Sequence, residues 1–148
     1  MIAYPITPQS EAAALIGFGT SAIGALPQGY VQNAASTVDY RAAIRAGRLA
    51  IVRGWALTDE DRMRREIIER LMCDLEVDVA RVCDAHGFAP SSLDGSIRAC
   101  AALQDDGLCE VEGHRIRIPA EASRLMRVVA AAFDAFLPET AKRHARAI

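Results

Sequence analysis

Cysteine and histidine are the side chains of this 148-residue sequence best suited to hold a metal or act as nucleophiles. Four cysteines are separated by gaps of 10, 17 and 9 residues, so no pair has the close spacing of a local metal site. We expect small buried hydrophobic residues, with a four-cysteine metal site assembled by the fold as the alternative. No histidine has a neighbouring cysteine or acid pair, which predicts structural or surface roles. The residues are Cys73, Cys83, Cys100 and Cys109, with His86, His114 and His144.

A glycine-rich apolar segment is the second candidate site. Residues 15–26 read Leu-Ile-Gly-Phe-Gly-Thr-Ser-Ala-Ile-Gly-Ala-Leu. Because both alternating faces are apolar, the segment is expected to form a strand buried on both sides and then a glycine loop. Gly17, Gly19 and Gly24 weaken a strand, so they suggest that a ligand or another backbone comes close. A turn-rich core segment without a ligand is the alternative.

Composition narrows the functional classes. Hydrophobic residues make up 51% of the chain and the net charge is −2, which is typical of a globular protein with one core and without a global positive field for nucleic acid. The apolar run 15–26 is shorter than the roughly 20 residues that cross a bilayer. Residues 1–11 contain Glu11 and no Lys or Arg, unlike a signal peptide. We expect a cytoplasmic protein with reduced thiols and no membrane partner.

The clearest predicted element is a helix that begins at Thr58. Thr58 and Asp61 form a capping-box pattern, and apolar residues then recur every three or four positions up to Leu75. Its charged residues pair acid before base at i,i+4, as on a solvated helix face. The pairs are Glu60–Arg64, Asp61–Arg65 and Glu66–Arg70.

The remaining pattern predicts a mainly α fold with a small β-hairpin. Residues 1–14 read as an irregular lead-in, 37–45 as a short helix capped by Ser36 or Thr37, and 49–57 as β-prone. Helices are expected over 78–86, 91–103 and about 119–137, with strands at 108–111 and 114–118. Helix, helix, helix, hairpin, helix is the order of a winged helix with an extra C-terminal helix.

A winged helix raises the question of DNA binding. The predicted recognition helix offers Arg98 against Asp94, Asp105 and Asp106. Phosphate contacts need several basic residues on the docking face. Nucleic acid is therefore not expected as a partner.

Several ordered stretches together resemble oxygen-independent coproporphyrinogen III oxidases, radical enzymes of haem biosynthesis. The resemblance runs from about Leu15 to Ile148. It is carried by Gly17-Phe-Gly-Thr-Ser-Ala-Ile-Gly24, Gly29-Tyr-Val-Gln-Asn33, Arg53-Gly-Trp-Ala-Leu-Thr58, Asp61-Arg-Met-Arg-Arg65, Leu71-Met-Cys73, Asp106-Gly-Leu and Phe133-Asp-Ala-Phe-Leu137.

The resemblance implies a set of site residues. Family enzymes are longer and carry, on a partial α/β barrel, a CxxxCxC motif for a 4Fe-4S cluster that cleaves S-adenosylmethionine. This sequence has no such motif, so no cofactor is expected on the chain alone. Ile23 maps onto an isoleucine that touches S-adenosylmethionine in the family, and Gly17, Gly19 and Ser21 are expected beside that cofactor. The stretch from Ala3 to Gln9 departs from the family's Gln-Gly-Tyr-Thr-Thr.

The resemblance also implies a domain division and partners. Residues 1–35 are expected to be a remnant of a barrel edge strand with its loop, and 36–148 a winged-helix-like domain that helps to enclose substrate. The chain alone is predicted to be inactive without a barrel domain of the same family, and to form a homodimer in isolation. The alternative is an independent winged-helix-like module that binds a protein or nucleic acid.

Overall fold

The described residues, 14–137 of the computed structural model, fall into two compact units. One ends at Thr58 and the other begins at Asp59. The sequence placed a boundary after residue 35 instead. Strand pairing accounts for the difference, because residues 51–56 hydrogen-bond to residues 29–33 and so belong to the same sheet.

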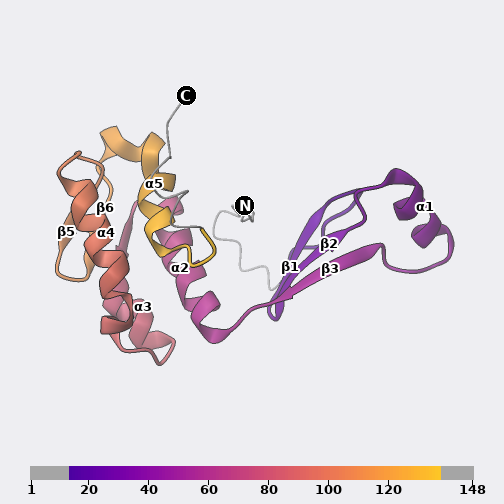
Figure 1. The fold of residues 1–148 in the computed structure, drawn as a ribbon, viewed down its shortest axis with the longest axis horizontal. Helices are drawn as coiled ribbons and strands as arrows, with labels where there is room; N and C mark the ends of the chain where they lie inside the picture. The colour runs from indigo at the N-terminus through magenta and orange to yellow at the C-terminus, as the bar shows by residue number, and fades with distance from the viewer. Residues whose placement is uncertain (1–13, 138–148) are drawn as a thin grey trace. The chain divides into compact units, whose positions relative to one another are not determined.

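The first unit is a three-stranded antiparallel sheet with one helix (Figure 1). Its order is β1-β2-β3, and a tight turn at residues 27–28 joins the first two strands. The helix begins where the Ser36 side chain accepts a hydrogen bond from the Asp39 N–H, as expected for an N-cap. The elements are β1 (Ile23–Leu26), β2 (Gly29–Asn33), α1 (Thr37–Arg45) and β3 (Ile51–Ala56).

The single strand predicted over residues 15–26 is wrong. Only Leu15 joins the sheet before β1, through a bridge to Ala25. Between them the chain loops outward, and the Phe18 side chain is 87% exposed. The cause lies at Gly19 (φ +99°) and Ser21 (φ +57°), whose left-handed backbone turns the chain before a strand can continue.

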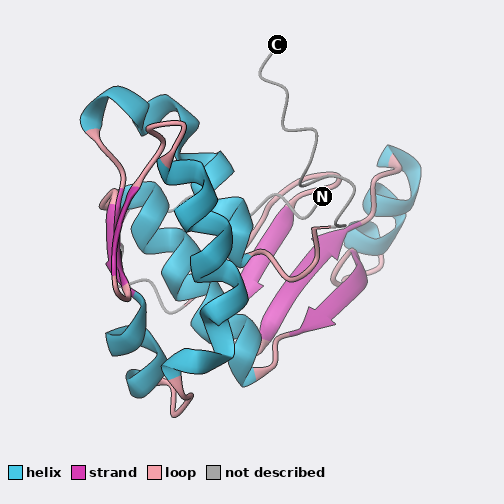
Figure 2. Ribbon diagram, turned by 60° about the vertical axis from the view of Figure 1, so that its left-hand side comes forward, coloured by secondary structure: helices cyan, strands magenta, loops and turns pink. Residues whose placement is uncertain are grey.

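The second unit packs helices against a small sheet (Figure 2). Its three strands have the order β4-β6-β5, all antiparallel. Strand β4 was not predicted: it is as short as β5 and β6, but unlike them it has no turn and partner strand next to it in the sequence. The elements up to the hairpin are α2 (Asp59–Cys73), β4 (Glu76–Asp78), α3 (Val79–Ala85), the 3-10 turn η1 (Pro90–Leu93), α4 (Asp94–Gln104), β5 (Glu110–Glu112) and β6 (Arg115–Arg117).

The last predicted helix is broken into three parts. These are the 3-10 helix η2 (Ala120–Leu125), α5 (Met126–Ala130) and the 3-10 turn η3 (Ala131–Phe133). The tighter 3-10 winding, with three residues per turn, rotates side chains off a 3.6-residue stripe. Val129 and Phe133 are therefore buried, whereas Leu125 and Phe136 of the predicted inner face are 37% and 42% exposed.

The core of the second unit lies where α2 meets α5 and the sheet. Met63, Ile67 and Leu71 of α2 are fully buried, as the helical spacing predicted. They belong to one buried cluster with Ile116 of β6 and Phe133. Such side chains each contribute roughly 1.5–3 kcal/mol of burial free energy. No helix among the described residues is long and apolar enough to cross a membrane.

Candidate functional site

The loop before β1 is held by side chains from later in the first unit. Asn33, at the end of β2, donates from Nδ2 to the carbonyl oxygens of Gly17 and Gly19, each at 3.0 Å. The Gly19 N–H donates to the Tyr40 hydroxyl of α1 at 3.1 Å. The Gln32 amide donates to the Ser21 carbonyl at 3.4 Å. Sheet and helix therefore fix a loop that has no regular structure of its own.

Gly17 of this loop and Gly24 of β1 permit close backbone contact. A Cβ on Gly17 would lie 2.7 Å from the Ile23 carbonyl oxygen, and one on Gly24 would lie 3.0 Å from that of Leu15. Side chains do not fit at such distances. Of the two partners that the sequence left open, the structure shows another part of the same chain at Gly17 and Gly24.

The four residues expected to contact a cofactor lie within one short segment. Gly17 and Gly19 are tied down by Asn33, and Ser21 is exposed at the turn. Ile23 is half-buried at the start of β1, opposite Gln32 in the sheet register. Sequence reasoning missed Asn33 and Tyr40 as site residues, because their distance from the loop, 14 to 21 positions, carries no local motif.

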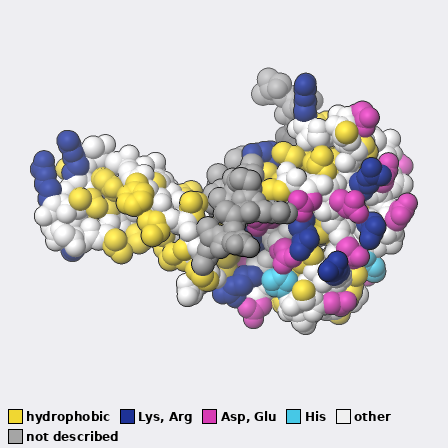
Figure 3. Space-filling view, turned by 180° about the vertical axis from the view of Figure 1, so that it is seen from behind, with side chains coloured by type: hydrophobic (Ala, Val, Ile, Leu, Met, Phe, Trp, Pro, Cys, Tyr) yellow, Lys and Arg dark blue, Asp and Glu magenta, His cyan; other side chains and the backbone are white. Residues whose placement is uncertain are grey.

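The sheet of the first unit has two unlike faces. Gly24, Val31 and Ile51 share a face whose apolar cavity, about 260 Å³ in volume, is also lined by Tyr40 and Ile44 of α1. Much apolar surface stays exposed, as Figure 3 shows by the hydrophobic side chains gathered on this unit. Of the ten exposed large hydrophobic residues between positions 14 and 137, eight belong to it: Ile16, Phe18, Val38, Ile44, Leu49, Ile51, Val52 and Trp55.

The cysteines do not form a metal site in the described part of the chain. Cys83, Cys100 and Cys109 are buried, as expected, but Cys73 is exposed at the end of α2, which corrects that expectation. Burial, with a smaller effect of neighbouring Cys109, raises the pKa of Cys100 to about 12. Within residues 14–137 no three His, Cys, Asp or Glu side chains are grouped so that they could hold a metal ion.

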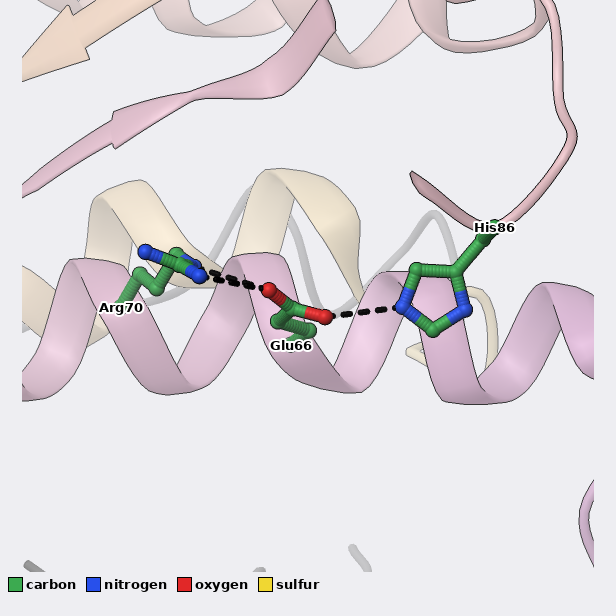
Figure 4. A network of polar contacts seen from close by, with 3 residues as sticks. All are labelled: Glu66, Arg70 and His86. Atoms are coloured by element: carbon green, nitrogen blue, oxygen red, sulfur yellow. Dashed lines mark hydrogen bonds and ion pairs between the residues drawn. The ribbon is translucent and has the colours of Figure 1, made fainter. Parts of the chain in front are cut away.

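A polar network links α2 to the end of α3 (Figure 4). His86 is the C-cap residue of α3, as predicted, and its Nε2 lies 2.8 Å from Glu66 Oε2. The same carboxylate accepts hydrogen bonds from Arg70 at 2.8 and 3.0 Å. Burial alone would raise the pKa of Glu66, but the hydrogen bonds from His86 and Arg70 hold it below its ordinary value. The fold thus gives His86 the acidic neighbour that the sequence did not reveal.

The predicted wing carries mixed charge. On one face of the β4-β6-β5 sheet, Arg117 lies between Glu76 and Glu110 in register, and Arg115 lies between Asp78 and Glu112. Arg117 is 3.9 Å from Glu110, and Arg115 is 3.6 Å from Glu76. The arginines of this sheet are therefore surrounded by carboxylates.

Comparison with known proteins gives one consistent result. Residues 57–125 match the HemN C-terminal domain. The oxygen-independent coproporphyrinogen III oxidase of Bradyrhizobium diazoefficiens is 44% identical over 142 residues, which cover 96% of this chain and 31% of that protein. The Escherichia coli enzyme of the same name is 32% identical over 131 residues, with 86% and 28% covered.

The fold gives the same relationship. The structure of coproporphyrinogen III oxidase (HemN) from Escherichia coli, a radical SAM enzyme, superposes with a TM-score of 0.78 at 28% identity, covering 86% of this chain and 30% of that one. The chain thus spans about a third of the length of the relatives that it matches. By sequence and by fold, the chain matches the C-terminal region of oxygen-independent coproporphyrinogen III oxidases.

Proposed function

We propose that this chain acts as the C-terminal part of an oxygen-independent coproporphyrinogen III oxidase, the enzyme of porphyrin and haem biosynthesis that decarboxylates coproporphyrinogen III to protoporphyrinogen IX. The observation that carries the proposal is a match over 96% of the chain to 31% of a relative with that activity in its name. The role of this part is to scaffold and cover the substrate. The compartment is the cytoplasm, which suits four unpaired cysteines.

The radical chemistry belongs to the other part of the enzyme. A 4Fe-4S cluster needs three thiolates that can converge on it, and the sequence has no CxxxCxC motif. Three of its four cysteines are buried, the pKa of every one is raised, and no three converge within residues 14–137, so they do not fit a cluster. We therefore expect the chain alone to be inactive. Gly17, Gly19, Ser21 and Ile23 are proposed to contact S-adenosylmethionine held by the other part.

The exposed surface of the first unit supports the proposal that another part of the enzyme packs against this chain. No strand pairs with the outer edge of β3 within residues 14–137, whereas the edge of β1 is bridged by Leu15. Strands with free edges and apolar faces seek partners. All six residues of β3 are exposed. We propose that the barrel of the full enzyme packs on this unit, as the resemblance implies for residues 1–35. The order of helices and hairpin in the second unit supports a winged-helix-like description.

The charge pattern works against the nucleic-acid alternative. The wing arginines, Arg115 and Arg117, alternate with Glu76, Glu110 and Glu112 on the same sheet face. Carboxylates placed between the arginines repel phosphates, so this face lacks the excess of positive charge that binding requires. We expect weak DNA binding without sequence preference.

A chimera tests the proposed function. The matched C-terminal region of the Bradyrhizobium protein would be replaced by this chain, and the product reconstituted anaerobically with iron and sulfide. We expect the chimera to convert coproporphyrinogen III. The conversion is measured by the fluorescence of the porphyrins after the reaction mixture is oxidised. The N-terminal part alone and this chain alone serve as inactive controls. A chimera that folds and cleaves S-adenosylmethionine but leaves coproporphyrinogen III unchanged would refute the proposal.

A further inference from the structure

The second face of the first unit's sheet has a chemical character of its own. Strand register pairs Ile23 with Gln32 and Gln32 with Arg53, and in the next row it pairs Tyr30 with Trp55. Residues paired across antiparallel strands point to the same face. Arg53 and Trp55 therefore share a face of β3, about 7 Å apart along the strand. The apolar cavity and α1 are on the opposite face, with Val31 and Ile51.

Both side chains reach the solvent. Arg53 is exposed, and Trp55 is 49% exposed although it is the only tryptophan of the chain. The ion pairs between described residues do not include Arg53. Arginine presents a planar fork of N–H donors that matches a carboxylate, and an indole offers a large apolar surface. Side by side they make a surface for a molecule that is apolar at its centre and acidic at its rim.

The net charge of the first unit also favours an acidic ligand. Residues 7–58 contain four arginines (Arg41, Arg45, Arg48 and Arg53) and two acids, Glu11 and Asp39, so their net charge is 4 − 2 = +2, in a chain whose total is −2. A local positive potential raises the concentration of a polyanion at the surface. The unit's charge and its exposed apolar area together complement an anionic, largely apolar ligand.

We propose that Arg53 and Trp55 bind the porphyrinogen substrate, with the Arg53 guanidinium on one of its propionate carboxylates and the Trp55 ring against the macrocycle. This inference rests on the proposed function, which supplies the substrate. Coproporphyrinogen carries four carboxylates on one large apolar ring. S-adenosylmethionine carries one carboxylate, an ammonium and a sulfonium, so a unit of net charge +2 does not favour it. Gln32, beside Arg53 in the sheet, is oriented by its bond to the Ser21 carbonyl.

The test measures binding to the full 148-residue chain, because both residues lie within it. The probe is coproporphyrin III, the air-stable oxidised form with the same four propionates. Its binding is monitored by the quenching of Trp55 fluorescence and by the porphyrin's own emission. We expect Arg53→Gln to weaken binding about tenfold, as for loss of a charge-assisted hydrogen bond. Arg53→Lys keeps the positive charge but lacks the planar fork of N–H donors, so it should lose less affinity than Arg53→Gln. Arg48→Gln, an exposed arginine of the same unit, is the matched control and should change binding less than twofold.

Further arms separate the possible ligands and the two hypotheses. The tetramethyl ester of coproporphyrin should bind the wild type and Arg53→Gln alike, and S-adenosylmethionine affinity should not depend on Arg53. Equal binding of coproporphyrin III by wild type, Arg53→Gln and Arg48→Gln, including no binding by any of them, overturns the assignment. So does an effect of Arg53→Gln on S-adenosylmethionine alone. The activity of the chimera, which judges the proposed function, is a separate readout from these affinities.

Discussion

Single residues decide the conformation of the loop before β1. The Asn33 side-chain amide donates to the carbonyl oxygens of Gly17 and Gly19, and the Tyr40 hydroxyl accepts a hydrogen bond from the Gly19 N–H. Each neutral hydrogen bond contributes about 1 kcal/mol net, which is enough to select one loop conformation. The glycines of this loop could be recognised in the sequence, but not the two side chains that hold it. Long-range contacts of a single amide or hydroxyl leave no periodic signal in a sequence.

Gly17 offers a direct test of this packing. Gly17→Ala should destabilise the protein by about 2 kcal/mol or more, because the new Cβ would lie 2.7 Å from the Ile23 carbonyl oxygen, which is backbone and cannot easily move. The matched control is Gly95→Ala in α4, where a Cβ meets nothing within 4 Å and alanine should stabilise the helix by about 1 kcal/mol. Urea unfolding measures both. A neutral Gly17→Ala would show that the loop is not packed as described.

The four cysteine thiols should differ in how fast they react. At pH 8 an aromatic disulfide reagent should modify one thiol of the native protein quickly, that of exposed Cys73, and all four only after denaturation. Burial raises the pKa of Cys100 to about 12, so almost none of it is thiolate at that pH. Burial, Glu69 and Asp74 also raise the pKa of Cys73, which should react more slowly than free cysteine. Cys73→Ser should abolish the fast phase, and a remaining fast thiol would contradict the burial.

At the scale of elements, strong periodicity was a better guide than apolar content. Helix α2 was predicted correctly because Met63, Ile67 and Leu71 repeat at helical spacing behind a capping pattern. Helix α1 and strands β5 and β6 were also predicted, each within a few residues. Residues 15–26 have apolar side chains but two backbone positions with positive φ, so the strand prediction failed there. Strand β4 was missed because no adjacent turn and partner strand in the sequence mark it, as they mark β5 and β6. The last helix was predicted as continuous because 3-10 turns satisfy nearly the same spacing.

The contact between α2 and the end of α3 should make stability depend on pH. Because the folded-state pKa of Glu66 is lowered, its stabilising effect is complete above the ordinary value of 4.5 and is lost as the pH falls through the folded value. Glu66→Gln should cost about 1 kcal/mol at pH 7, a modest figure since the pair is partly exposed, and much less at pH 3. Glu60→Gln, which alters an exposed pair with Arg64, is the control. If the difference in unfolding free energy between wild type and Glu66→Gln does not change with pH, Glu66 does not link stability to pH.

For the whole molecule, exposed apolar surface is the main feature of residues 14–58. Ile16 and Phe18 are 69% and 87% exposed. At about 25 cal/mol per Å², leaving a few hundred Å² of such surface in water costs several kcal/mol. In isolation we expect the chain to form a two-fold dimer through this surface, as the composition of residues 15–26 suggested.

Sedimentation velocity would measure this association. Replacing both Ile16 and Phe18 with Asp should give a monomer with an unchanged circular dichroism spectrum. Leu125→Asp, which adds a charge at an exposed apolar residue of the other unit, should leave the dimer intact. A wild type that stays monomeric from micromolar to millimolar concentration would show that the surface needs no second copy.

The central claim is that this chain supplies the C-terminal part of a coproporphyrinogen III oxidase. The most direct measurement is rescue of anaerobic growth in a bacterial strain that lacks its own oxygen-independent enzyme. The chimera with the N-terminal two thirds of the Bradyrhizobium protein should restore growth, and neither part alone should do so. Rescue by this chain alone, or failure of a chimera that is expressed, folded and loaded with its cluster, would contradict the account.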